Sequence, residues 1–401
     1  MGRGNPTELF PTDEPIPSDG LVGRADDITE IATQLQVGAN VILAAPRRTG
    51  KTTVCDAAVE RLAADEDYYT VKIDLFYIAD IDQLAEALIE ETVKNRPLLR
   101  KALFAAKQTG KTFYESISLT VGAKMAGGDY EGLDFRLLPT LRQDPVAYLD
   151  YALALPERIA KADGKRLILV IDEFQSVEQI GENHQRGWAM TLKKKMRASF
   201  QRSSNVSFLF AGSLEHMMRT IFGKEDEPFY NFGTFHELGP ILPEEWEVGL
   251  LKRFKQDRTK VDADALDLII ERGSQHPRAT MLIAQRAHIS SIIAGTKHVT
   301  LGLVEAAHAD ALRSERPKHE AWVDRIQHLE TAAINRVALR ATVAIAEKRA
   351  PYAKQRYPKE ISRALNALQN AGFIQREGKQ GWKIVDPLFQ DYLTSLDLHL
   401  A

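Results

Sequence analysis

The sequence contains a single cysteine, Cys55, among 401 residues. One thiol forms neither an intrachain disulfide nor a cysteine zinc cluster, so both are excluded. The histidines are scattered without the spacing of metal ligands, and we predict no transition-metal site. A chain without disulfides fits a reducing compartment, and we expect the protein to act in the cytoplasm.

Long apolar runs are missing as well. No stretch of about 18 apolar residues occurs, so we expect no membrane span. The first twenty residues are rich in proline and acids and lack the apolar core of a signal peptide, and we expect an extended arm there. Hydrophobic residues make up 44% and charged residues 27%, as in ordinary globular proteins. A chain of 401 residues exceeds one usual core, so two or three domains are expected.

The net charge of −3 conceals a basic segment. Residues 331–383 contain 11 Lys and Arg against 3 Asp and Glu, so this segment carries +8 and the remainder of the chain −11. The basic charge is therefore local, and this segment is the part of the chain that suits an acidic partner.

Two stretches fit a phosphate-binding loop (P-loop) whose first position is alanine instead of glycine: APRRTGKT at 45–52 and AAKQTGKT at 105–112. Such a loop needs a buried strand before it and a helix that starts at its lysine, because loop amides and helix dipole then converge on the phosphates. The first stretch follows the strand pattern ANVILA and precedes the helical pattern TTVCDAAVERLAA. The second stretch has the reverse order, and we interpret it as a turn before a hairpin.

The stretch at 45–52 is therefore the predicted phosphate site. Lys51 would bring its positive charge to the phosphates of ATP, and the Thr52 hydroxyl would bind Mg²⁺. Alanine is the next smallest residue after glycine, and we expect a slightly strained but functional loop. The residues predicted to surround the nucleotide here are Ala45, Pro46, Arg47, Arg48, Thr49, Gly50, Lys51, Thr52 and Thr53.

A second motif supplies carboxylates for hydrolysis. RLILVIDEF, residues 166–174, has five apolar residues between Arg166 and Asp172 and ends in two acids. A fully apolar strand is typical of the centre of a parallel sheet, where ligands bind at the carboxyl edge. We predict that Asp172 holds Mg²⁺ and that Glu173 orients and deprotonates the attacking water. VSFLFAGS, 206–213, is another such strand, and Ser213 at its end is predicted to reach the γ-phosphate or the water.

Taken in order, these motifs resemble one family. LVGRADDITEI (21–31), APRRTGKTT (45–53), LILVIDEFQ (167–175), FAGSLEHMMRTIF (210–222) and GSQHPRAT (273–280) are similar to the archaeal-type ATPases of the AAA+/STAND class, relatives of the initiator (origin-recognition) ATPases. The resemblance runs from about residue 20 to the C-terminus. It implies that Val22, Gly23 and Arg24 lie near the adenine. It also implies that Arg278 is a second sensor, which reaches the phosphates from a helical lid.

One segment departs from that family. Its members often carry a Gly-Arg pair after the second polar strand, a candidate for completing a neighbouring subunit's site. Here the segment reads PFYNFGTF, 228–235, without arginine, and Arg219 upstream is the nearest substitute. We therefore expect slow switching between nucleotide states more than hydrolysis activated in a ring.

The order of patterns predicts an α/β fold with four regions. We expect an extended arm at 1–20, a doubly wound P-loop αβα ATPase domain at 21–238, a helical lid at 239–312 and a winged-helix domain at 313–401. Within the ATPase domain, two extended runs around a glycine turn predict a hairpin insert at about 116–137.

The winged-helix prediction rests on two helical patterns followed by a strand pair: AAINRVALRATVAIAEK, PKEISRALNALQNAG and FIQREGKQGWKIVD. Leu365, Leu368 and Ile374 are predicted core residues. A winged helix meets DNA with one helix in the major groove and the wing on the backbone. The outward side chains predicted to contact DNA are Lys359, Arg363, Arg376, Lys379 and Lys383.

The sequence thus predicts an ATP-dependent switch that hydrolyses ATP slowly to ADP and phosphate and whose winged helix contacts double-stranded DNA. Two alternatives stay open. One is a DNA-binding regulator that uses ATP without meaningful turnover, and the other is a STAND-type signalling scaffold whose winged helix binds protein. A homo-oligomer is open as well.

Overall fold

The computed structural model describes residues 6–12, 16, 20–46, 48–96, 138–350, 358–378 and 381–396. The chain forms two compact units, here called the sheet unit (Asp27–Ala44 and Val54–Glu237) and the lid unit (Met1–Asp26, Ala45–Thr53 and Leu238–Ala401). The second GKT stretch and the predicted hairpin insert at 116–137 lie outside the described residues.

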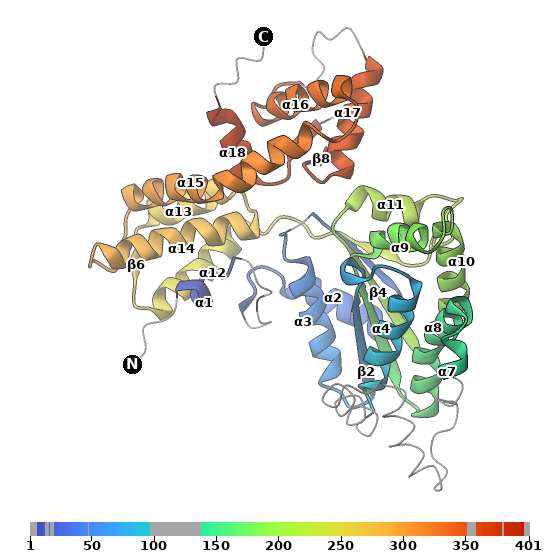
Figure 1. The fold of residues 1–401 in the computed structure, drawn as a ribbon. Coiled ribbons are helices and arrows are strands. Elements are labelled where there is room, and N and C mark those ends of the chain that lie inside the picture. Colours follow the sequence, from blue (N-terminus) through green and yellow to red (C-terminus); the bar gives the residue numbers. More distant parts are fainter. Residues whose placement is uncertain are drawn as a thin grey trace. The chain divides into compact units, whose positions relative to one another are not determined.

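A five-stranded parallel sheet forms the centre of the sheet unit (Figure 1). Its strand order is β2-β3-β4-β1-β5. Its strands are β1 (Val41–Ala44), β2 (Tyr68–Asp74), β3 (Arg166–Asp172), β4 (Val206–Gly212) and β5 (Thr234–His236). All of β1 and β4 and nearly all of β3 are buried, as expected for parallel strands covered on both faces.

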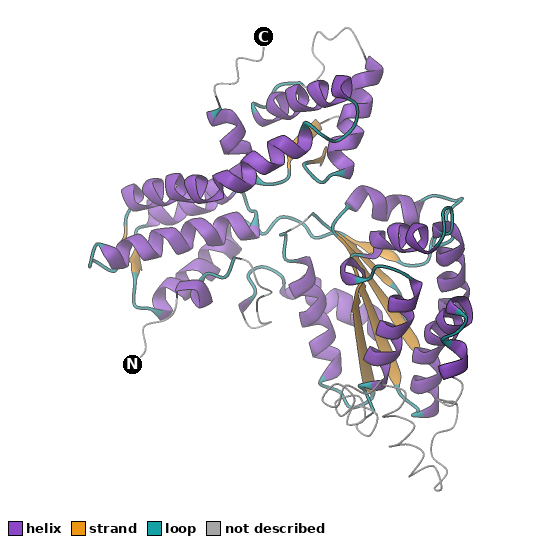
Figure 2. Cartoon of the chain, in the orientation of Figure 1, coloured by secondary structure: helices purple, strands orange, loops and turns teal. Residues whose placement is uncertain are grey.

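Helices cover both faces of this sheet (Figure 2). On one face, Leu167, Leu169 and Ile171 of β3 share a core with the apolar sides of α4, α8 and α10. On the other face, Ser207 of β4 donates a hydrogen bond to the Leu35 carbonyl of α2. The helices that begin in or cross this unit are α2 (Ala25–Gln36), α3 (Lys51–Ala63), η2 (Leu75–Tyr77), α4 (Ile81–Val93), α7 (Leu138–Leu141), α8 (Pro145–Ala162), η5 (Phe174–Ser176), α9 (Val177–His184), α10 (Ala189–Phe200) and α11 (Glu215–Gly223). The predicted doubly wound αβα arrangement is confirmed.

Residues 243–326 of the lid unit form a group of helices, here called the lid helices: α12 (Pro243–Gln256), α13 (Ala263–Gly273), α14 (Pro277–Ile293) and α15 (Leu301–Ile326). A short parallel pair, β6 (Lys260–Val261) and β7 (His298–Val299), joins the loops between them. The predicted boundary between residues 312 and 313 falls inside α15. This helix continues because it has buried residues in two cores, Ala311 with the lid helices and Ile326 with the elements that follow.

The N-terminal arm is not extended throughout, contrary to the prediction. It contains one helical turn, α1 (Pro6–Leu9). Phe10 then inserts into the core of the lid helices, where its ring centroid lies 4.8 Å from that of Phe254 and 5.5 Å from that of His288. Burial of this aromatic side chain holds the arm on the lid helices.

The C-terminal segment, residues 332–396, begins with the elements that the sequence predicts. They are α16 (Ala332–Ala346), α17 (Pro358–Asn370) and the antiparallel pair β8 (Ile374–Glu377) and β9 (Gly381–Ile384). The predicted core residues Leu365, Leu368 and Ile374 are buried. A further helix, α18 (Pro387–Ser395), follows β9. Among the described residues, no helix has both the length and the apolar character needed to span a membrane.

Candidate nucleotide-binding site

The P-loop follows β1 and contains left-handed backbone at Arg48, with φ of 68°, and Gly50, with φ of 87°. Glycine adopts such angles without steric cost, which explains the glycine at position 50. Ala45 is buried and does not belong to the described residues with positive φ. The alanine at the first loop position therefore introduces no left-handed strain, and the expected strain lies at Arg48 instead.

The loop ends where α3 begins. Thr49 Oγ1 donates a hydrogen bond of 2.8 Å to the Pro46 carbonyl and closes the turn. Lys51 is the first residue of α3 and is 6% exposed, so its charge is held close to the helix N-terminus. Arg47 lies outside the described residues. A helix N-terminus beside a buried lysine is an arrangement that suits an anion.

A cavity of about 230 Å³ lies within the lid unit beside this loop. Residues 48–53 line it together with Val22, Arg24 and Arg278, so the structure brings three separate predicted segments to one place. Ile241 and Met281 add apolar lining. Trp246 also lines the cavity; it is 1% exposed, and its indole N–H has no hydrogen-bond partner among the described residues. The nucleotide roles of these residues stay predictions.

The segment Val22 to Arg24 is docked on α12. Val22 packs against Gly249, where an added Cβ would lie 2.5 Å from Val22 Cγ2. Gly23 has φ of 61°, and an added Cβ there would lie 2.7 Å from Ile241. Arg24 is 5% exposed and donates a hydrogen bond of 2.9 Å to the Gly239 carbonyl. Both glycines are required by this close approach.

Arg278, in the first turn of α14, is held by Glu315 of α15. Arg278 Nη1 and Nη2 donate hydrogen bonds of 2.8 and 2.9 Å to the two carboxylate oxygens of Glu315. Lys318 contacts the same carboxylate. Burial by itself would raise the pKa of Glu315, but the hydrogen bonds from Arg278 and Lys318 lower it to about 2. This acidic partner of the predicted sensor arginine was not predictable from the sequence, because Glu315 is distant from Arg278 along the chain.

The predicted catalytic carboxylates lie at the carboxyl edge of the sheet, in the sheet unit. Asp172 and Ser213 are each 4% exposed. Ser213 Oγ donates a hydrogen bond of 2.6 Å to Glu173 Oε2, and the Gln175 amide donates to the same oxygen. Glu173 has φ of 50°, an unusual angle for a residue with a side chain and one that often marks functional positions. That Asp172 and Thr52 hold Mg²⁺ stays a prediction.

A third acid, Asp74, lies next to this pair and was missed by the sequence analysis. Asp74 ends β2 and is the register partner of Asp172 in β3. Burial raises the pKa of Asp74, and the charges of Asp172 and Glu173 raise it further, against a backbone hydrogen bond from Phe76 that lowers it. The signal was present, because the strand pattern YYTVKID also ends in an acid. Arg219, the suggested substitute arginine, pairs with Glu215 and Glu237 at the surface.

The predicted DNA-contacting residues do not share one surface. Lys359 and Arg363 are exposed on α17, where Arg363 pairs with Glu330 at 2.6 Å. Arg376 lies 3.9 Å above the Trp382 ring, its register partner, whereas Lys383 is opposite Gln375. Side chains alternate along a strand, so Lys383 lies on the other face of the hairpin from Arg376. Lys379 lies outside the described residues.

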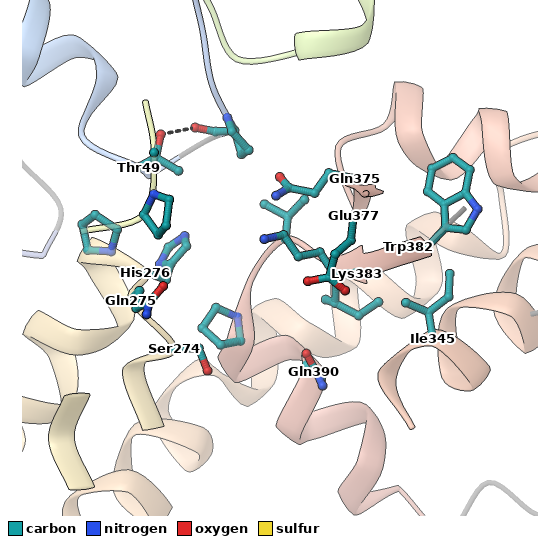
Figure 3. A pocket seen from close by; sticks show the side chains of 18 of the residues that line it. Thr49, Ser274, Gln275, His276, Ile345, Gln375, Glu377, Trp382, Lys383 and Gln390 are labelled. Carbon is teal, nitrogen blue, oxygen red and sulfur yellow. Dashed lines mark hydrogen bonds between the residues drawn. The ribbon is translucent and has the colours of Figure 1, made fainter. Parts of the chain in front are cut away.

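Lys383 instead faces a second cavity of the lid unit, of about 970 Å³. Figure 3 shows Thr49 and His276 on one side of this cavity and Gln375, Lys383 and Gln390 on the other. Pro46 lines this cavity and not the smaller one.

No protein-family model and no curated protein matches this sequence. Solved structures do match it. The Walker-type ATPase PABY2304 of Pyrococcus abyssi is similar over 96% of this chain and 99% of its own, with 13% identity and a TM-score of 0.66. The ORC2 protein of Aeropyrum pernix, in its ADPNP-ADP complexes, is similar over 97% of this chain and 98% of its own, with 14% identity and a TM-score of 0.50. The likeness spans nearly the whole chain and confirms the predicted P-loop ATPase fold.

Proposed function

We propose that the protein binds ATP with Mg²⁺ in the 230 Å³ cavity and hydrolyses the ATP slowly. The observation that carries this proposal is the cavity lining, which joins the P-loop to Arg278 and to the apolar side chains of Val22 and Met281. Loop amides, a lysine and a guanidinium suit a triphosphate, and apolar side chains suit a base. The buried indole N–H of Trp246 suits an acceptor on the base or the ribose.

Oxygen ligands are what Mg²⁺ prefers, and the Thr52 hydroxyl and the Asp172 carboxylate would hold it. When bound, the ion supplies positive charge to the phosphates. Glu173 would accept a proton from water, whose oxygen forms a bond to the γ-phosphorus while the bond to the bridging oxygen breaks. ADP and phosphate leave, and the carboxylate releases its proton to solvent.

The hydrogen bonds to Glu173 in the sheet unit support slow hydrolysis of ATP. The Glu173 carboxylate accepts hydrogen bonds from Ser213 and Gln175, and a base held in this way is less available to water. The lack of an arginine in residues 228–235 points in the same direction.

We further propose that the C-terminal segment is a winged helix that contacts double-stranded DNA. The order of its elements, the +8 charge of residues 331–383 and the exposure of Lys359 and Arg376 support this. Regions 21–238, 239–312 and 313–401 would then act as ATPase domain, lid and DNA-contacting domain, with α15 shared by the last two.

The test is phosphate release from ATP by the full chain, with and without duplex DNA. We expect turnover on the order of 0.01 per second or slower, and a change in that rate when DNA is added. ATP binding without turnover would favour the regulator that does not hydrolyse ATP. A rate of phosphate release that does not change when DNA is added would favour the protein-binding scaffold.

A further inference from the structure

Within the lid unit, a series of ion pairs connects Arg278 to the C-terminal segment. Glu315 pairs with Arg278 on one side and contacts Lys318 on the other. Lys318 Nζ lies 3.6 Å from Asp386 Oδ2, and Arg48 of the P-loop lies 3.8 Å from the same oxygen. Arg48 and Arg278 both line the candidate nucleotide cavity. Arg48 pairs with Asp386 directly, and Arg278 is connected to the same carboxylate through Glu315 and Lys318.

Asp386 is the N-cap residue of α18. Its Oδ1 accepts hydrogen bonds of 3.0 and 3.2 Å from the backbone N–H groups of Leu388 and Phe389. Asp386 is 6% exposed, and a carboxylate buried to this degree depends on its cationic partners. Movement of Arg48 or Lys318 would therefore act directly on the first turn of α18.

The Arg278–Glu315 pair has the geometry of a phosphate contact. Both Nη groups of Arg278 donate to one carboxylate, and the same planar fork binds two phosphate oxygens equally well. The side chains of Arg278 and Glu315 are 9% and 12% exposed, so the guanidinium needs an anion beside it at all times. Glu315 occupies the edge of the guanidinium formed by Nη1 and Nη2, and a phosphate bound at this same edge has to displace it, so the two anions compete for it.

We propose that Glu315 is a positioning residue that takes the place of a γ-phosphate at Arg278, and that bound ATP takes Arg278 from it. Without Arg278, Glu315 attracts Lys318 more strongly, and this weakens the ion pair between Lys318 and Asp386 at the start of α18. ADP, which has no γ-phosphate, leaves the pair intact. The proposal rests on the nucleotide site proposed above and adds how that site distinguishes ATP from ADP.

The competition predicts a measurable penalty on ATP affinity. If Arg278 is free of Glu315 in a tenth of the molecules, the apparent affinity for ATP is lower by about tenfold. Glu315→Gln removes the competing charge and keeps the shape of the side chain. We expect this variant to bind ATP about tenfold more tightly than the wild type and to bind ADP within about twofold of it.

The experiment is a titration of the full chain with fluorescent ATP and ADP analogues. Glu320→Gln is the matched control, because Glu320 lies on the same helix but pairs with Arg316 at the exposed surface. We expect Glu320→Gln and the conservative variant Glu315→Asp, which retains a carboxylate, to remain close to the wild type.

A second background separates competition from a general change in packing. In a chain that carries Arg278→Ala there is no arginine to compete for, so adding Glu315→Gln should change ATP affinity by less than about twofold. An equal gain in both backgrounds, or no gain in either while the wild type binds ATP, would overturn the competition and leave the nucleotide site intact. A wild type and a Glu315→Gln variant that both fail to bind ATP would instead contradict the nucleotide site itself.

The link to the C-terminal segment has its own readout. Amide hydrogen exchange at the first turn of α18 should become faster when ATP is added to the wild type and should not change with ADP. Unchanged exchange at α18 with saturating ATP would show that the ion pairs do not transmit the nucleotide state.

Discussion

Ser213 Oγ donates a hydrogen bond of 2.6 Å to Glu173 Oε2. Glu173 directly follows β3 and Ser213 directly follows β4. Because these two strands are neighbours in the parallel sheet, the sheet brings the hydroxyl to the carboxylate. The Gln175 amide donates to the same oxygen. In this geometry the candidate base is held in place by two donors on one of its oxygens, which lowers the basicity of that oxygen.

Glu173→Gln removes the base and retains the shape of the side chain. We expect phosphate release to fall by at least about a hundredfold while ATP affinity changes by less than about threefold. Phosphate release at saturating ATP, with Glu225→Gln as a surface control, is the measurement. Unchanged turnover in Glu173→Gln would mean that the base is another residue, with Asp74 the next to test.

Ser213→Ala removes the closest donor to Glu173. Because a carboxylate freed from this donor is more available to water, we expect the catalytic rate constant to rise with little change in ATP affinity. The matched variant is Ser207→Ala. Ser207 lies on β4, the strand that Ser213 follows, and its hydroxyl donates a hydrogen bond to the Leu35 carbonyl on the other face of the sheet. If Ser213→Ala and Ser207→Ala alter turnover equally, the hydrogen bond to Glu173 has no specific role.

The faces of the β8–β9 hairpin give a prediction about DNA. A winged helix that binds DNA neutralises phosphates, so Lys359→Glu should weaken binding to duplex DNA. The slope of log affinity against log salt concentration should decrease by about one, which corresponds to one lost phosphate contact. Lys383→Glu should have a smaller effect, because this side chain faces the second cavity. Lys260→Glu, on β6 between α12 and α13, is the control. Absence of duplex binding at low salt with ATP and with ADP would rule out the DNA contact and favour the protein-binding scaffold.

The sequence predicted the sheet and the motifs because their signals are local. An apolar run followed by acids located β3, Asp172 and Glu173, and strand–loop–helix order selected 45–52 over 105–112. Partners distant in the sequence were not predictable. Glu315 and Asp386 look like ordinary surface acids until folding brings them to Arg278 and Arg48. Likewise, the separation of Arg376 from Lys383 depends on strand register.

The buried His319 predicts how stability depends on pH. It lies among the rings of Trp322, Phe389 and Tyr392, and burial, followed by the charge of Lys318, lowers its pKa from 6.5 to about 4. Between these values the unfolded chain binds a proton that the folded chain does not. Stability should therefore fall as pH decreases from about 6.5 to about 4, by no more than about 3 kcal/mol.

Denaturant unfolding over this pH range is the measurement, with His319→Gln as the variant that should flatten the dependence. Glu315, with its pKa lowered from 4.5 to about 2, contributes in a lower window, where stability is lost as the carboxylate is protonated. If His319→Gln retains the wild-type dependence between pH 6.5 and 4, another group is responsible.

We propose that the P-loop at 45–52, and not the GKT stretch at 105–112, holds the phosphates of ATP. The decisive measurement is calorimetric titration of ATP with Mg²⁺ into the wild type, Lys51→Ala and Lys111→Ala. Removal of the buried charge at the start of α3 should abolish binding in Lys51→Ala, and Lys111→Ala should bind like the wild type. Equal loss of binding in both variants, or undiminished binding in Lys51→Ala, would show that the phosphates are not held by the loop at 45–52.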